Sequence, residues 1–561
     1  MPSVFYAGAK KRKTRHFRPI FKMLPRESPQ QQTEGGLLSL VDELLLSIID
    51  QIDSRESLRN LAATCARLRS LTEPYIWRSL LVRKGDHAID IVKALDSREA
   101  RASYIHELSI RYQHGSGKGI DQLNHHIGLM DKLRHLTIES PCPNNTEWVR
   151  SDHFDDWTKI NYTSLLEAAV YPPPGLPPVL PMLQSLALHG HGRDERKFVL
   201  GRTAVVFFHP TLRHLTLSCT NFDADITHAD ISPEKRKSTP LQSLTLIECN
   251  VNVQFLDVVL DLPKALKELY IGERLYVFKE HPSRDPKKRT SHPLFLTALA
   301  RQADSLEKLT HVAGTFTHLL PTQIDDQASR SKLRSLKNLT FLEIGLESSL
   351  YSYLEQNDYP DSLKTLRIND AAVFQTLTDQ TLVHHPGDVL KRCTDLVTRR
   401  TSHPFDLEVC FNDSAVEDQI LSTIPHGRYA AILAALLGGS IRSPVYKLAS
   451  ALEARGGAHL RLFSQRFHSG KSYIPPYMYG EEVPSEVQFY DSDDFWRFSG
   501  RNFRAVDDDA LKEELRGAGK EGFVCFACAR RQRTCYNLGD GSACVVCESE
   551  GKECCYEGMA G

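Results

Sequence analysis

The hexapeptide LRHLTL at residues 212–217 carries a pattern that returns along much of the chain. In each copy a leucine is followed, three residues later, by a second leucine and, two residues after that, by a third leucine or an isoleucine. Near-identical copies stand at 241–246 (LQSLTL) and 363–368 (LKTLRI). The alternating part predicts a short strand, and the first leucine is expected to pack beneath it. The copies begin at Ile105, Leu133, Leu183, Leu212, Leu241, Leu266, Leu339 and Leu363, with a poorer copy at Leu306.

Successive copies start 28, 50, 29, 29, 25, 40, 33 and 24 residues apart. Most of these intervals resemble the period of leucine-rich repeats, which is roughly 20–29 residues. One repeat cannot bury its own apolar face, so the resemblance implies that the repeats stack into a solenoid. The array is irregular, with insertions at 141–180 and 273–304, and the asparagine or cysteine usual after the last leucine stands clearly only at Cys249.

Composition limits the class of protein. A chain of 561 residues predicts three to four domains of about 150 residues each. A hydrophobic content of 41% and a net charge of −1 indicate a soluble globular protein without general attraction to nucleic acid or anionic membranes. The sequence lacks a signal-peptide pattern and a run of roughly 18 apolar residues that could span a membrane. Cysteines at short metal-binding spacing favour a reducing compartment, so a nuclear or cytoplasmic location is expected.

Residues 37–82 show a helical period instead. Apolar side chains recur there at steps of three and four, as one helix face requires: Leu44, Leu45, Ile48, Ile49 and Ile52. Asp53 and Ser54 break the pattern, and two further short helices are expected before Trp77. A helical unit of about 45 residues is marginally stable alone. Part of its apolar surface is therefore expected to meet a partner.

The segment LLSLVDELLLSIIDQIDSRESLRNLAATCARLRSLTEPYIWRSL, residues 37–80, resembles an F-box. That motif typically opens with Leu-Pro-x-Glu, runs through an apolar helix and an aspartate-containing turn, continues with Leu-x-x-Leu and a cysteine, and ends near a tryptophan. Val41 replaces the usual proline. The matching residues are Leu40, Glu43, Leu44, Ile48, Ile49, Asp53, Leu58, Leu61, Cys65, Leu68 and Trp77.

The F-box resemblance implies docking onto the adaptor protein of a cullin–RING (SCF-type) ubiquitin ligase. An F-box followed by leucine-rich repeats is similar to the substrate-receptor subunits of these ligases, in which the F-box docks and the solenoid selects a protein target. The resemblance makes Cys65 a packed side chain rather than a nucleophile. The adaptor-binding residues that it implies are Leu40, Leu44, Ile48, Ile49, Leu58, Leu61 and Leu68.

The C-terminal residues 523–558 carry a second motif. Six cysteines read C-x2-C-x6-C, then eight residues, then C-x2-C-x6-C: Cys525, Cys528, Cys535, Cys544, Cys547 and Cys554. A C-x2-C turn places two thiolates on one zinc ion. The spacing therefore predicts a zinc module, with two zinc ions favoured. A one-zinc ribbon stays open, with four ligands: Cys525, Cys528, Cys544 and Cys547.

The six-cysteine spacing resembles the fungal-type binuclear zinc cluster of transcription factors, so the chain resembles a fungal F-box protein with a zinc cluster at its C-terminus. A basic run from Arg530 to Arg533 echoes that family's basic helix. The alternative function is accordingly a zinc-cluster DNA-binding transcriptional regulator. Residues 523–557 hold four basic and five acidic side chains, and six thiolates with two zinc ions add −2, so the net charge is near −3. Phosphate contacts dominate nucleic-acid affinity, which disfavours DNA as the partner.

The expected fold class is α/β. A disordered basic tail (1–36) precedes a three-helix F-box (37–82) and an irregular leucine-rich-repeat solenoid (83–415). An uncharacterised or linking region (416–522) then leads to the small zinc module (523–558). No nucleophile–base pair or phosphate-cradling motif is evident in the sequence, so an enzyme is not expected.

Overall fold

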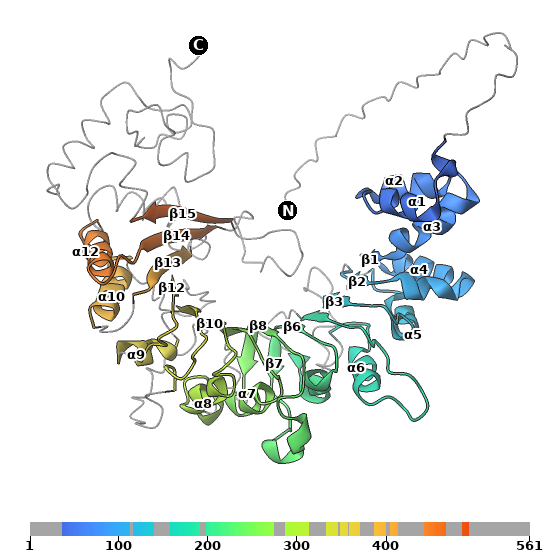
Figure 1. Ribbon diagram of the computed structural model, residues 1–561. Coiled ribbons are helices and arrows are strands. Elements are labelled where there is room, and N and C mark those ends of the chain that lie inside the picture. Colours follow the sequence, from blue (N-terminus) through green and yellow to red (C-terminus); the bar gives the residue numbers. More distant parts are fainter. Residues whose placement is uncertain are drawn as a thin grey trace, which may run out of the picture. The chain divides into compact units, whose positions relative to one another are not determined.

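The computed structural model describes residues 36–492, apart from 113–115, 140–156, 191–197, 274–285, 313–331, 346–347, 357, 371–385, 400–403, 413–441 and 467–484. The chain divides into two compact units, Met1–Ile76 and Trp77–Gly561. Figure 1 labels most of the α-helices and strands of both. The predicted basic tail up to residue 35 and the predicted zinc module lie outside the described residues.

The described part of the first unit is helical. A short 3-10 turn, η1 (Leu37–Ser39), precedes α1 (Asp42–Ile49), α2 (Arg55–Ala62) and α3 (Ala66–Trp77). The hydroxyl of Ser54 accepts a hydrogen bond from the amide of Ser57 at 3.2 Å and so caps α2, because serine at this position satisfies an otherwise unpaired amide. The three helices expected before Trp77 are confirmed.

The second unit is built on a large, mostly parallel sheet, which confirms the α/β class. Neighbouring strands follow one another in chain order, and all pairs along the sheet are parallel except β14 with β15. The strands are β1 (Ser79–Val82), β2 (Glu107–Ile110), β3 (His135–Glu139), β4 (Ser185–His189), β6 (His214–Ser218), β8 (Ser243–Val251), β9 (Glu268–Glu273), β10 (Lys308–Val312), β11 (Phe341–Gly345), β12 (Thr365–Asp370), β13 (Asp406–Asn412), β14 (Leu460–Arg466) and β15 (Ser485–Asp491). Two short strands, β5 (Phe198–Val199) and β7 (Thr220–Phe222), pair beside β8.

Helical segments connect most of the neighbouring parallel strands, since parallel pairing requires a crossover connection. Figure 1 shows α7 and α8 on the same side of the strands that they connect. The α-helices are α4 (Gly85–Ser97), α5 (Leu123–Gly128), α6 (Tyr162–Val170), α7 (Val253–Leu260), α8 (Leu294–Ala300), α9 (Leu350–Glu355), α10 (Pro386–Arg399) and α12 (Arg442–Glu453). The 3-10 segments are η2 (Glu99–Tyr104), η3 (Ile120–Gln122), η6 (Gly201–Phe208), η7 (His228–Asp230), η8 (Pro233–Lys235) and η10 (Pro286–Lys288). None of the described helices combines the length and apolarity that crossing a membrane requires.

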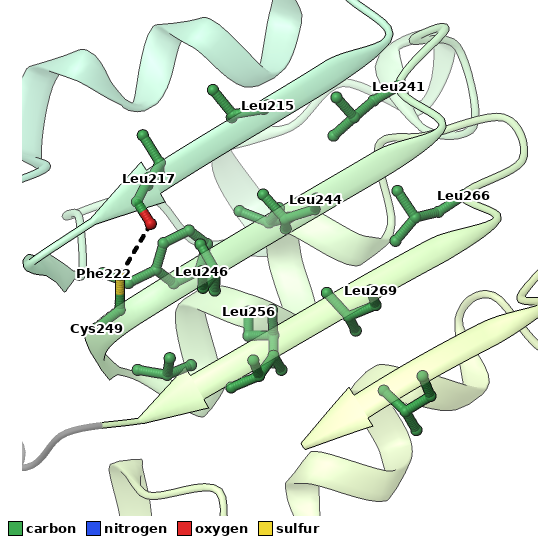
Figure 2. Close-up of a cluster of buried hydrophobic side chains, with 14 of the residues drawn as sticks. Leu215, Leu217, Phe222, Leu241, Leu244, Leu246, Cys249, Leu256, Leu266 and Leu269 are labelled. Carbon is green, nitrogen blue, oxygen red and sulfur yellow. Dashed lines mark hydrogen bonds between the residues drawn. The ribbon is translucent and has the colours of Figure 1, made fainter. Parts of the chain in front are cut away.

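The repeated leucines stand opposite one another across the sheet. Leu215 pairs in register with Leu244, and Leu217 with Leu246. All four are buried, and the close-up in Figure 2 shows these side chains beside Leu241, one of the leading leucines, which is also buried. Burying one leucine side chain contributes about 1.5–3 kcal/mol. A strand is found at each of the nine predicted positions, from β2 to β12.

The sheet is longer than the repeat pattern indicates. Residues 79–82, placed in the helical F-box by the sequence, form β1 and pair with β2. Residues 460–466 and 485–491, placed in the uncharacterised region, form β14 and β15. Strand β14 keeps the alternating pair Leu460 and Leu462, but Gly457 stands where the leading leucine belongs. The pattern could not be recognised there because its first apolar residue is missing.

Candidate functional site

Helix α1 carries apolar side chains on two adjoining faces. Leu45 and Ile49 are each 1% exposed and pack inside the helical unit. Leu44 and Ile48 stand one helical turn apart and are 52% and 43% exposed. Burying one face stabilises the unit, whereas leaving leucine and isoleucine in water gives no such stabilisation. The exposed pair is therefore a candidate contact surface.

The exposed apolar surface extends to the turn before α1. Leu37 is 47% exposed, Leu38 51% and Val41 57%. Together with Leu44 and Ile48 they form what we call the α1 patch. Five large apolar side chains exposed within 12 residues differ from singly scattered ones, and such clusters mark sites of protein contact.

The side chain of Arg67, on α3, holds the turn that carries the α1 patch. Its guanidinium donates to the carbonyl oxygens of Leu38 and Leu40, each at 2.7 Å. It also donates to the Asp42 carboxylate from Nε at 2.9 Å and from Nη2 at 2.7 Å. Both side chains of this ion pair are well exposed, so the charge attraction itself contributes little. The planar fork of donors fixes direction instead, and it locks the path of the chain from Leu38 to Asp42.

The seven predicted adaptor-binding residues separate into three groups. Leu44 and Ile48 are exposed as a contact surface requires, and Leu40 and Leu61 are half-buried. Ile49, Leu58 and Leu68 are 1%, 7% and 4% exposed, so they belong to the core of the helical unit. Their direct contact with the adaptor stays a prediction. The sequence period identifies apolar positions but cannot distinguish two adjoining helix faces when both are apolar.

Four residues of this site are not among the predicted adaptor-binding residues: Leu37, Leu38, Val41 and Arg67. Leu37 and Leu38 precede the first predicted helix, where a helical period gives no signal. The uninterrupted run LLSLV at 37–41 was nevertheless visible as an apolar stretch in a polar context. Arg67 offers no signal in the sequence, because its role arises from contacts with residues 25 to 29 positions earlier in the chain.

Buried polar side chains lie at the carboxyl ends of neighbouring strands in the second unit. Glu139 ends β3, and its carboxylate lies 3.0 Å from Nε of Arg111. Burial raises the pKa of Glu139 to about 8, against the opposing effect of Arg111. His189 stands opposite Glu139 on β4; burial and then Arg111 lower its pKa to about 4. Its Nδ1 lies 3.3 Å from Oγ of Ser218. These groups are paired inside the fold, which favours a structural role.

A second buried cluster has the composition of a catalytic triad. Nδ1 of His311 lies 2.7 Å from Oγ of Ser348, and Nε2 lies 3.4 Å from Oε2 of Glu273. These three residues are at most 7% exposed. Thr290 donates to the same Glu273 oxygen at 2.5 Å, and Ser348 accepts from the amide of Leu350 at 3.2 Å. The cluster ties the segments after β9 and β11 to the sheet, and its burial favours this role over nucleophilic catalysis.

The six predicted zinc ligands lie outside the described residues. Among the residues that the structure does describe, no group of three or more histidine, cysteine, aspartate or glutamate side chains is placed to hold a metal ion. Neither a scan against protein-family models nor a search of curated proteins finds a match for this chain.

Proposed function

We propose that the chain is a substrate-receptor subunit of a cullin–RING (SCF-type) ubiquitin ligase, in which the helical unit is an F-box that docks onto the ligase adaptor. The observation that carries the proposal is the α1 patch. A small helical unit leaves five large apolar side chains in water on one turn and one helix, and Arg67 fixes their presentation. Such a surface is suited to burial by a partner, and an enzyme is not proposed.

The second unit is proposed to be an irregular leucine-rich-repeat solenoid that selects the protein target. Support comes from the register of the repeated leucines across neighbouring strands. It also comes from Cys249, which is fully buried and donates from Sγ to the carbonyl oxygen of Leu217 at 3.5 Å (Figure 2). A small polar side chain at this point satisfies a backbone carbonyl in the neighbouring repeat. The repeats of the second unit then stack through a continuous core.

The proposal is tested by co-purification of the full-length chain with the adaptor protein. Stable association supports adaptor docking. A folded chain that fails to retain the adaptor would refute it. Mass spectrometry of other proteins retained in cells would then indicate the class of target.

Val41→Pro is expected to stabilise the helical unit. Val41 already has φ −67° and ψ 157°, within the range that proline requires, and Leu40 before it is extended with ψ 146°. The Val41 amide donates no hydrogen bond to any described residue. Proline would therefore restrict the unfolded chain without straining the folded one, which contributes about 0.4–1 kcal/mol. Thermal unfolding of the purified chain measures the change.

Val41→Ala is the matched control, because it removes the valine side chain without fixing φ. It is expected to leave the unfolding midpoint unchanged or slightly lower. A Val41→Pro midpoint below that of Val41→Ala would show that the turn described here is not the one adopted in solution.

The C-terminal cysteines are proposed to form a structural zinc module that serves targeting or partner contact. Elemental analysis is expected to find two zinc ions per chain, because six thiolates at this spacing suffice for two ions that share ligands. Cys535→Ser and Cys554→Ser are the informative variants. One zinc ion per chain in both wild type and variants would establish the four-cysteine ribbon instead. Tight, sequence-specific binding to duplex DNA that depends on Cys528 would favour the transcriptional-regulator alternative.

A further inference from the structure

The residue immediately before each strand occupies equivalent positions along one edge of the sheet. Along the main sheet from β1 to β9, without the short strands β5 and β7, these residues are Arg78, His106, Arg134, Gln184, Arg213, Gln242 and Lys267, which we call the leading row. The row ends at Lys267, because the next equivalent residue, before β10, is the acidic Glu307. None of the seven side chains is acidic, although the whole chain has a net charge of −1. The repeated leucines do not explain this bias, since they lie at other positions of each repeat.

Backbone hydrogen bonds fix the spacing of the leading row. The carbonyl oxygen of Arg78 accepts from the amides of His106 and Glu107 at 2.8 and 3.0 Å. The carbonyl of His106 accepts in the same way from Arg134 and His135. The pattern continues through Gln242, so each member is tied to the next. The row is therefore a regular array, in which neighbours are separated by the strand spacing of about 4.8 Å.

Three arginines of the leading row are available to a partner. Arg78, Arg134 and Arg213 are exposed, and none of them forms an ion pair or side-chain hydrogen bond with another described residue. Lys267 differs, because its Nζ pairs with Glu307 at 2.9 Å. The three arginines precede β1, β3 and β6, which are separated from one another by one intervening strand each. Their backbones are thus about 9–10 Å apart.

Basic side chains outnumber acidic ones around His106 in this part of the row. Burial lowers the pKa of His106, and the charges of Arg134, Arg78 and Lys132 lower it further. Glu107 is the nearby acid and acts in the opposite direction. Gln184 lies between two of the arginines and adds amide donors without adding charge. The combination suits an anionic ligand that follows the edge across several strands.

We propose that the leading row binds an extended acidic peptide segment with a carboxylate at about every third residue. In the polyproline II form of an extended chain, each residue advances about 3.1 Å and three residues complete one turn, so every third side chain lies on the same face. Successive carboxylates are then about 9 Å apart, which matches the separation of successive arginines. Arginine forks pair with carboxylates through two donors, which favours carboxylates at this spacing over a diffuse negative charge. The inference names the target class of the proposed receptor and rests on that function for its biological meaning.

The test uses the full-length chain and three labelled 12-residue peptides. The first repeats Glu-Gly-Ser, the second has the same composition with its glutamates contiguous, and the third replaces glutamate by glutamine. Fluorescence anisotropy is expected to show that the first binds most tightly. Its affinity should fall as salt rises from about 50 to 200 mM, because exposed ion pairs are screened. Equal binding of all three peptides would overturn the inference. Equal binding of the first two would overturn the carboxylate spacing.

Arg134→Glu with Arg213→Glu is expected to weaken binding of the first peptide at least about tenfold, since two attractive contacts become repulsive. Lys93→Glu with Lys235→Glu makes the same change in net charge at exposed positions on α4 and η8, and should leave binding unchanged. Equal losses in both double variants would show attraction by net charge only and overturn the site. A short single-stranded RNA that competes more strongly than the peptide would overturn the choice of partner.

Adaptor binding is measured on the same samples, so that a failure of the peptide site can be distinguished from a failure of the proposed ligase function. Loss of peptide binding with adaptor binding retained is expected for the Arg134→Glu, Arg213→Glu variant. A wild-type chain that binds the adaptor but none of the peptides refutes the acidic target. One that binds the peptide but not the adaptor refutes the ligase role and leaves the peptide site standing.

Discussion

Replacing Leu44 and Ile48 together by alanine is expected to weaken adaptor binding by roughly a thousandfold while the chain stays folded. Apolar anchors buried at an interface contribute about 2 kcal/mol each, or roughly 30-fold in affinity apiece. Both side chains are about half exposed in the free chain, so truncating them removes little from its core. Isothermal titration of the adaptor into wild-type and variant chains measures the change.

Two further variants separate contact from folding in this experiment. Glu56→Gln alters an exposed residue of α2 and should bind like the wild type. Leu45→Ala removes a side chain that is 1% exposed and is expected to destabilise the helical unit by about 2–5 kcal/mol. If the Leu44→Ala, Ile48→Ala variant bound the adaptor as tightly as wild type, the α1 patch would not be the docking surface.

Glu139→Gln is expected to stabilise the sheet unit at alkaline pH. Burial raises the pKa of Glu139 from an ordinary 4.5 to about 8, so the folded state holds this proton more tightly than the unfolded state. The stabilising contribution is complete below pH 4.5 and is lost as the pH rises through 8. The shift corresponds to up to about 5 kcal/mol between these limits. Glutamine keeps the shape but never ionises.

Thermal unfolding followed across this pH range measures the effect. The wild-type midpoint should fall relative to that of Glu139→Gln as the pH rises, and the two curves should converge at low pH. Glu107→Gln is the matched control, because Glu107 is exposed on the neighbouring strand β2. Parallel curves for wild type and Glu139→Gln would mean that Glu139 is already ionised at neutral pH and stabilised by Arg111.

The strands were predictable because their signal is local. The alternating leucines Leu215 and Leu217 identify a strand without knowledge of its neighbours. Because every repeat has the same spacing, the pattern also predicts how neighbouring strands pair in register. Strand β14 was not recognised because Gly457 replaces the leading leucine. Strand β10 gave a poor copy because His311 stands where its neighbours β9 and β11 carry Ile271 and Ile344. This buried histidine forms hydrogen bonds with residues from other repeats. A local sequence pattern cannot reveal such partners.

The candidate site was predictable only in part. The resemblance to an F-box identified Leu44 and Ile48, which are exposed, but equally Ile49, which is buried beside them. A single residue step rotates a side chain by about 100° around a helix, so the packing of the other helices decides which neighbour faces water. The leading row could not be predicted from the sequence for another reason. Its members are far apart in sequence, and parallel pairing alone places Arg78, Arg134 and Arg213 on one edge.

The helical unit is proposed to dock onto the adaptor of a cullin–RING ligase. The most direct test mixes the purified full-length chain with purified adaptor and determines the mass of the product by size-exclusion chromatography with light scattering. We expect a one-to-one complex for wild type and separate components for the Leu44→Ala, Ile48→Ala variant. Separate components for a wild-type chain that circular dichroism shows to be folded would contradict it.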